Sequence, residues 1–153
     1  SRWGGDWTMT VFYNKATGTE QTALVKGHID PEAPTLVRMH MLSPFADLYG
    51  EPGPRADLIP KAMKMIDEEG SGVLVILNRP SINFASRAVK AREDRDASAM
   101  DELRDYGVGA QILTELGVHD MVLITNSHHT LIALDGYGLS IVGERPIPSG
   151  LVE

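Results

Sequence analysis

The feature that most restricts how this chain can fold is an uninterrupted apolar run, VLVIL, at residues 73–77. A strand of this composition has no polar face, so it must be covered on both sides. In the preceding segment, residues 58–66, apolar side chains recur at helical spacing, and Gly70 stands where such a helix ends. A helix that leads into a doubly covered strand predicts a fold in which helices pack on a sheet.

The remaining chain divides into a β-rich N-terminal half and a C-terminal half in which helices and strands alternate. β-Branched and aromatic residues predict strands at 7–14, 20–29 and 35–42, whose short connections favour antiparallel pairing. The prolines and glycines of residues 43–55 predict a loop without helix. Further expected elements are helical segments at 84–91, 102–116 and 128–134, a charged connection at 92–101, and strands at 120–125 and 139–142.

Together these elements predict an α/β fold with mixed sheets in one domain, residues 1–153. In the helical segment at 84–91, we expect Phe84, Ala88 and Val89 to face inward because of their spacing.

The composition limits the function. The 153 residues carry a formal net charge of -7, which disfavours nucleic acid as a partner because phosphate binding requires clustered Lys and Arg. No apolar run approaches the roughly 18 residues of a membrane span, and we recognise no signal-peptide pattern, so we expect a cytoplasmic protein. The first residue is Ser, so we expect a piece of a longer polypeptide. The chain contains no cysteine, which excludes disulfides and thiolate metal sites.

Residues 102–113, ELRDYGVGAQIL, begin with charge, pass through two glycines and continue into an apolar face. Ile112 and Leu116 keep helical spacing, and Gly117 stands at the helix end. This pattern has two interpretations. It is a capped amphipathic helix with a solvated acidic start, or a helix that presents reactive side chains such as Arg104 at a cleft.

Residues 103–118 resemble the GTP cyclohydrolase II family, which catalyses the first step of riboflavin synthesis. The resemblance continues in the same order through most of the chain, in ALVKG, LVRMH, MVLITN, GYGL and GERPI at residues 23–27, 36–40, 121–126, 136–139 and 143–147. It implies a GTP cyclohydrolase II-like α/β fold and a homodimer. In many bacteria such a domain follows 3,4-dihydroxy-2-butanone 4-phosphate synthase in one polypeptide, so this synthase is the expected N-terminally fused partner.

The resemblance also implies a zinc site, whose ligands this sequence lacks. Family members open the guanine imidazole ring of GTP and release formate and pyrophosphate, using zinc on three cysteines to activate water as hydroxide. The corresponding positions are Ser43, Pro54 and Ala56. We therefore expect no metal cofactor. A replacement site would have to come from other side chains: His40, Asp47, Glu51, Asp57 or the pair His128–His129.

Most residues that would hold the substrate are also replaced. The family's R-x-E-G-R segment reads NRPSIN here, so Arg79 alone is left in it to meet a phosphate. The lysine that contacts substrate in the family is Thr130. Tyr106 and Thr125 match the family and are the other candidates for nucleotide binding.

Two residues are the candidate remnants of the catalytic machinery. Arg104 matches the family's proposed nucleophile in guanylyl transfer, and Glu102 stands in place of its acidic partner, an aspartate. Glutamate is one methylene longer but has the same base chemistry. Retention of Arg104 and Asp105 is explained equally by function and by hydrogen bonds that hold the helix start.

We therefore expect a GTP cyclohydrolase II-like domain that does not open the ring of GTP. Its expected role is that of a structural or regulatory domain of a dihydroxybutanone phosphate synthase. Two alternatives stay open. One is an active GTP cyclohydrolase II with a non-cysteine metal site, and the other is a sensor module that binds GTP or a related nucleotide without turnover.

Overall fold

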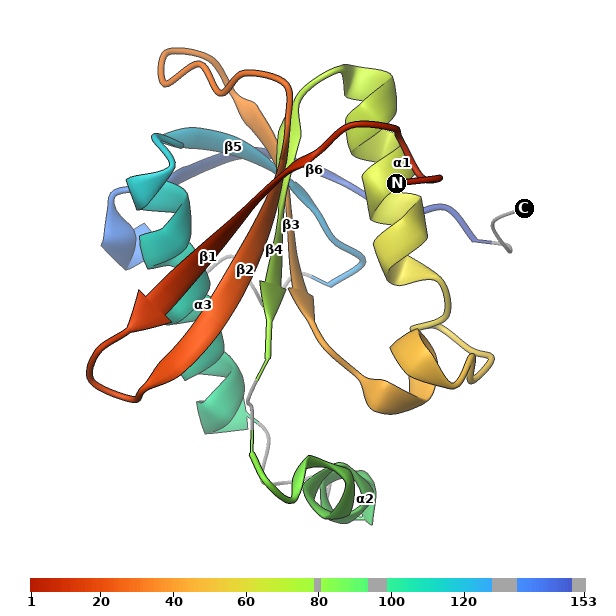
Figure 1. The fold of residues 1–153 in the computed structure, drawn as a ribbon. Helices are drawn as coiled ribbons and strands as arrows, with labels where there is room; N and C mark the ends of the chain where they lie inside the picture. The colour runs from red at the N-terminus through yellow and green to blue at the C-terminus, as the bar shows by residue number, and fades with distance from the viewer. Residues whose placement is uncertain (79–80, 94–98, 128–134, 150–153) are drawn as a thin grey trace.

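The structure of the chain is a computed structural model, which describes residues 1–78, 81–93, 99–127 and 135–149. Its centre is one mixed sheet with the strand order β1-β2-β4-β3-β5-β6 (Figure 1). The strands are β1 (Thr8–Asn14), β2 (Thr19–Lys26), β3 (Thr35–Met41), β4 (Gly72–Leu77), β5 (Asp120–Ile124) and β6 (Ser140–Arg145). The predicted α/β class and mixed sheet are confirmed.

The position of β3 in the sheet differs from the sequence-based expectation. β1, β2 and β4 are antiparallel neighbours, whereas β3 lies between β4 and β5 and is parallel to both. The expected antiparallel arrangement of the first three strands is therefore wrong for β3. The reason is that β4, which is apolar on both faces, takes the protected place between β2 and β3.

Two helices cover opposite faces of this sheet (Figure 1). α1 (Leu58–Glu69) packs Met63 and Ile66 against Leu36 and Leu74 of the central strands. α3 (Ala99–Glu115) covers the other face and buries Ala110, Ile112 and Leu113 in a second core. β3 and β4 contribute Val37, Met39, Val73, Val75 and Leu77 to the same core. Alternate residues of β3 and β4 thus enter different cores, as the two-residue period of a strand requires. Among the described residues, no helix is long and apolar enough to cross a membrane.

Both long helices end as the sequence predicts. Gly70 adopts a left-handed conformation with φ of 93° and donates its N–H to the carbonyls of Ile66 and Asp67. Gly117, with φ of 88°, follows α3 in the same way. A left-handed residue after a helix favours glycine because it has no Cβ.

Three local expectations are wrong. A five-residue helical turn, η1 (Pro44–Leu48), interrupts the predicted loop, because proline is compatible with the first position of a helix. α2 (Phe84–Glu93) buries none of its side chains, so Phe84 and Val89 are about half exposed rather than inward. Helices also extend into both ends of the segment expected to be a connection, residues 92–101. The helix expected at 128–134 lies outside the described residues, and η2 (Asp135–Tyr137) follows it.

Gly72 marks the tightest backbone approach in the central sheet. A Cβ atom on this residue would lie 2.6 Å from the carbonyl oxygen of Leu36 and 2.9 Å from Cγ2 of Ile66. The first neighbour is strand backbone and the second belongs to a packed helix, so neither can shift without disturbing the core.

We expect Gly72→Ala to lower the free energy of unfolding by about 1–3 kcal/mol because the added methyl group overpacks this contact. Urea unfolding followed by tryptophan fluorescence measures the change. Gly136→Ala is the matched control, because a Cβ at Gly136 meets nothing within 4 Å. Equal stability of the two variants would contradict this account of the core.

Candidate functional site

The candidate site lies where the parallel strands end, which is the usual binding edge of a parallel sheet. Arg38 and His40 belong to the second half of β3, and Asp47 belongs to η1 just beyond it. Thr125 follows the end of β5, and Tyr106 lies on α3. All five side chains are at least partly buried.

A buried hydrogen bond joins β3 to the loop that follows it. Nε2 of His40 lies 2.8 Å from Oδ2 of Asp47, and the two side chains are only 1% and 6% exposed. The backbone N–H of Ser43 donates to the same carboxylate oxygen at 2.7 Å. Proline at the start of η1 and this carboxylate together explain why a helical turn forms in a Pro- and Gly-rich segment.

The charge state of Asp47 follows from these contacts. Burial raises the pKa of a carboxyl group, but the hydrogen bonds from His40 and Ser43 and the charges of His40 and Arg55 outweigh it. The net result is a pKa of Asp47 below its usual value. Asp47 is therefore a carboxylate at neutral pH.

Arg38 is a partly buried charge that interacts electrostatically with Asp47 of this pair. Its Nη1 donates to the carbonyl of Ile124 at 3.1 Å. Burial lowers the pKa of Arg38 from its usual value; interaction with Tyr106 opposes that effect, and Arg55 adds to it. The guanidinium nevertheless keeps its charge at any physiological pH.

Two polar atoms of the site are buried without a hydrogen-bond partner among the described residues. They are Nε of Arg38 and Nδ1 of His40. Buried polar groups are normally satisfied, so such atoms indicate a place where water or a ligand completes the bonding.

The glycines of the α3 motif bring the helix close to the rest of the site. A Cβ on Gly109 would overlap Cε of Met39 in β3, and one on Gly107 would lie 2.6 Å from the hydroxyl of Tyr137. The two glycines therefore permit close packing of α3, and nothing in their geometry requires a ligand. This supports the structural interpretation of the glycines, while the roles of the charged residues before them stay predictions.

The residues present do not fit a zinc site of the family type. Ser43 carries a hydroxyl, while Pro54 and Ala56 have no side-chain donor atom. Within the described ranges, no three His, Cys, Asp or Glu side chains are grouped so that they could hold a metal ion. His40 and Asp47 are brought together, but they bind each other.

Among the described residues, the other candidates for a replacement metal site do not join His40 and Asp47 in a group that could bind a metal. Glu51 forms an ion pair with Arg92 of α2. Asp57 precedes α1 in a left-handed conformation, with φ of 57°. The pair His128–His129 lies outside the described residues.

The predicted nucleotide and catalytic residues are only partly covered by the structure. Thr125 is buried, and its hydroxyl donates to the carbonyl of Ser127 at 2.9 Å and accepts from the N–H of the same residue at 3.0 Å. Tyr106 is half-buried close enough to influence Arg38. Arg79 and Thr130, and the side chains of Glu102 and Arg104, lie outside the described part of the chain. The proposed roles of all these residues stay predictions.

The sequence-based prediction missed Arg38 as a site residue. A signal was present, because LVRMH places an arginine within an otherwise apolar strand. Charged residues are rare in buried strands unless they are paired, so an arginine at this position indicates a site residue.

We expect Asp47→Asn to lower the free energy of unfolding at pH 7 by about 1–3 kcal/mol, because the buried imidazole loses its charged partner. The folded-state pKa of Asp47 is lowered, so the carboxylate contributes fully above the unfolded pKa of about 3.9 and loses its contribution as the pH falls through the folded value. The difference between variant and wild type should therefore shrink below about pH 4. Urea unfolding between pH 2 and 7 tests this, with the exposed Asp6→Asn as control; a difference independent of pH would contradict it.

Comparison with known proteins agrees with this architecture. The sequence model of the GTP cyclohydrolase II family matches residues 1–146. Riboflavin biosynthesis protein RibBA of Parabacteroides distasonis is 36% identical over 157 residues, covering 94% of this chain and 38% of the relative. RibBA of Aquifex aeolicus is 36% identical over 160 residues, covering 94% and 39%.

Two further relatives differ in their stated organisation. The monofunctional riboflavin biosynthesis protein RIBA 2, chloroplastic, of Arabidopsis thaliana is 35% identical over 150 residues, covering 94% of this chain and 31% of the relative. The crystal structure of RibBX, a two-domain 3,4-dihydroxy-2-butanone 4-phosphate synthase from A. baumannii, superposes with a TM-score of 0.54 and 24% identity, covering 97% of this chain and 43% of that chain. The superposition supports the fold. The chain spans less than two-fifths of each of the three curated relatives' length.

Proposed function

This chain belongs to the GTP cyclohydrolase II family, and we propose that it is a member in riboflavin biosynthesis that no longer opens the imidazole ring of GTP. Its role in this proposal is that of a structural or regulatory domain for a dihydroxybutanone phosphate synthase in the cytoplasm. Ring opening in the family depends on a zinc-activated water, which thiolates hold in place. The proposal rests on the replacement of that ligand set.

The observation that carries the proposal is the hydrogen bond between His40 and Asp47. It engages Nε2 of His40 and Oδ2 of Asp47, two atoms that would otherwise be good metal ligands near Ser43. A zinc ion would have to displace this bond and would still lack a third ligand among the described residues. The donor set of the described residues therefore supplies no site for the metal that would generate the hydroxide the reaction needs.

The relatives support a synthase as the partner. The chain aligns with 38% and 39% of two RibBA proteins, and with 43% of a two-domain dihydroxybutanone phosphate synthase. We therefore place this domain in one polypeptide with a synthase domain, where it contributes stability or regulation. Removal of residues 1–153 from that polypeptide should lower the thermal stability of the synthase or change its kcat.

A second candidate function has a specific observation in its favour. Arg38 holds a partly buried positive charge that interacts with the half-buried Tyr106, and its Nε is buried with no partner among the described residues. A buried guanidinium is suited to an anionic ligand. A sensor domain that binds GTP or a related nucleotide without turnover would use this charge to hold the anionic phosphates.

The first test is a calorimetric titration of GTP into the purified chain with zinc present, followed by a formate assay. We expect no formate and less than about 0.1 zinc per chain, because the donor set cannot hold the ion. A catalytically active family member assayed in parallel is the positive control.

The outcomes separate the candidates. Saturable heat near one site per chain without formate, lost in Arg104→Ala, would favour the sensor. Stoichiometric zinc that disappears in Asp47→Asn, together with formate release, would overturn the proposal and establish a non-cysteine metal site. Absence of both heat and formate would leave the structural role.

A further inference from the structure

Residues 1–7, which precede β1 and which we call the N-terminal strap, pack on the face of the sheet that α1 covers. Trp3 and Trp7, the two tryptophans of the chain, are partly buried against the core beneath α1. Figure 1 shows the N-terminus beside this helix. The first residues of a domain are usually poorly ordered unless specific contacts tie them down. The packing of both indole rings therefore marks the strap as a fixed part of the fold.

A single lysine at the end of β2 clamps the strap to α1. Nζ of Lys26 donates a hydrogen bond to the carbonyl oxygen of Gly4 in the strap. The same ammonium group forms an ion pair with Oδ1 of Asp67 on α1 at 3.0 Å. It also lies 5.6 Å from the centroid of the Trp7 ring, within cation–π range. The Lys26 side chain is only 18% exposed, so solvent and salt screen these contacts less than those of a surface pair.

The backbone of the strap is shaped to lie close to α1. Gly4 has a φ of 116°, and a Cβ atom there would lie 2.9 Å from Cβ of Asp67. The nitrogen of Ser1 donates to the carbonyl of Gly5 at 2.6 Å, and the N–H of Gly5 donates to the carbonyl of Ser1 at 2.9 Å. A backbone amide donates as an amino group does, so this turn also forms when another residue precedes Ser1.

We propose, on the premise of the fused synthase in the proposed function, that the strap is a docked joint that holds the preceding domain at a fixed orientation beside α1. Domain boundaries usually fall in flexible linkers that few contacts cross, and such linkers let domains move independently. The strap differs because two indole rings and the Lys26 clamp fasten it. A movement of the synthase domain is therefore passed directly to α1 and β2, which the clamp connects.

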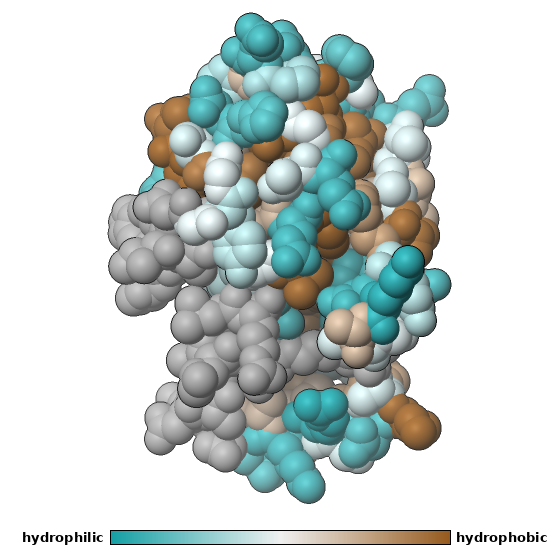
Figure 2. Space-filling model, turned by 90° about the vertical axis from the view of Figure 1, so that its left-hand side faces the viewer, coloured by the Kyte–Doolittle hydropathy of each residue, from teal (hydrophilic) through white to brown (hydrophobic). Residues whose placement is uncertain are grey.

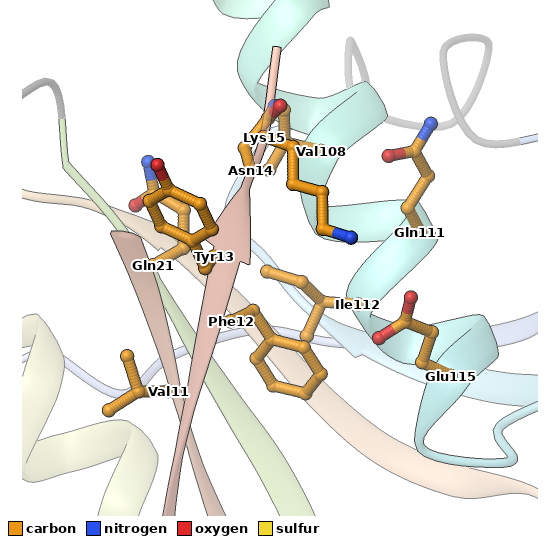
Figure 3. A pocket seen from close by; sticks show the side chains of 10 residues that line it. All are labelled: Val11, Phe12, Tyr13, Asn14, Lys15, Gln21, Val108, Gln111, Ile112 and Glu115. Carbon is orange, nitrogen blue, oxygen red and sulfur yellow. The ribbon is translucent and has the colours of Figure 1, made fainter. Parts of the chain in front are cut away.

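The joint directs the preceding domain away from the opposite face of the sheet. On that face β1 and α3 border a groove of about 510 Å³ (Figure 3). Phe12 and Ile112 are among its apolar lining residues, and Lys15 and Glu115 are among its polar ones. Figure 2, which views the molecule from the left side of Figure 1, shows hydrophobic side chains exposed in several places among hydrophilic ones. In the proposed arrangement the groove stays accessible.

Trypsin cleavage after Arg2 measures how often the strap undocks, because a protease needs a locally opened segment. Mass spectrometry follows the cleavage in the full-length polypeptide that carries this chain. Asp67→Asn should raise the rate about 5-fold, since the partly buried Lys26 loses its ionic partner. Glu69→Gln is the matched control and should leave the rate unchanged, because it removes the ion pair of the same helix with Arg145 of β6. Neither substitution adds or removes a trypsin site.

Small-angle X-ray scattering of the same polypeptide tests whether the joint fixes the orientation of the two domains. Wild type and Glu69→Gln should have the same radius of gyration. Lys26→Met removes the charge and the hydrogen bond of the clamp, so the domains should separate and the radius should increase. Circular dichroism confirms that all variants are folded.

The outcomes separate the joint from the proposed function. Equal cleavage rates of Asp67→Asn and Glu69→Gln, or equal radii of Lys26→Met and wild type, would overturn the joint and leave the proposed loss of ring opening untouched. Formate release from a polypeptide whose strap is protected would overturn only that proposed loss. A natural polypeptide with no synthase domain ahead of the strap would overturn both the joint and the proposed partner.

Discussion

The fold depends on the burial of β4 on both of its faces. Leu74 enters the core beneath α1, and Val73, Val75 and Leu77 enter the core beneath α3. Burial of each such side chain contributes about 1.5–3 kcal/mol, so the two helices are held to a common strand from opposite sides. This arrangement places β3 beside β4 and directs Arg38 and His40 to the edge where the parallel strands end.

Features that depend on local spacing could be predicted from the sequence. The apolar run of β4, the stripe of α1 and the terminal glycines of both long helices all appear where the sequence indicates. Strand order could not be predicted in the same way. The parallel position of β3 is set by burial of β4, which joins segments more than thirty residues apart. For α2, the helix was predicted correctly but the burial of its apolar side chains was not. Its spacing is helical, yet the helix buries none of its residues.

The candidate site was predictable in parts. The sequence indicated that the thiolate ligands were gone, and it marked His40 and Asp47 separately as polar residues of interest. It could not indicate that they bond to each other, because that contact depends on the helical turn at Pro44. Arg38 was overlooked for a related reason. Its importance comes from the burial of its Nε, which has no partner in the described part of the chain, and only the packed structure reveals this.

The hydrogen bond between His40 and Asp47 changes what the loop after β3 depends on. A loop held by metal ligands is ordered only when the ion has been delivered, and its folding follows the supply of that ion. Here two hydrogen bonds within the chain hold the loop, and they join an imidazole and one backbone N–H to a single carboxylate. In the proposed metal-free domain, the loop would therefore take its shape during folding itself, in a cell rich in zinc or starved of it.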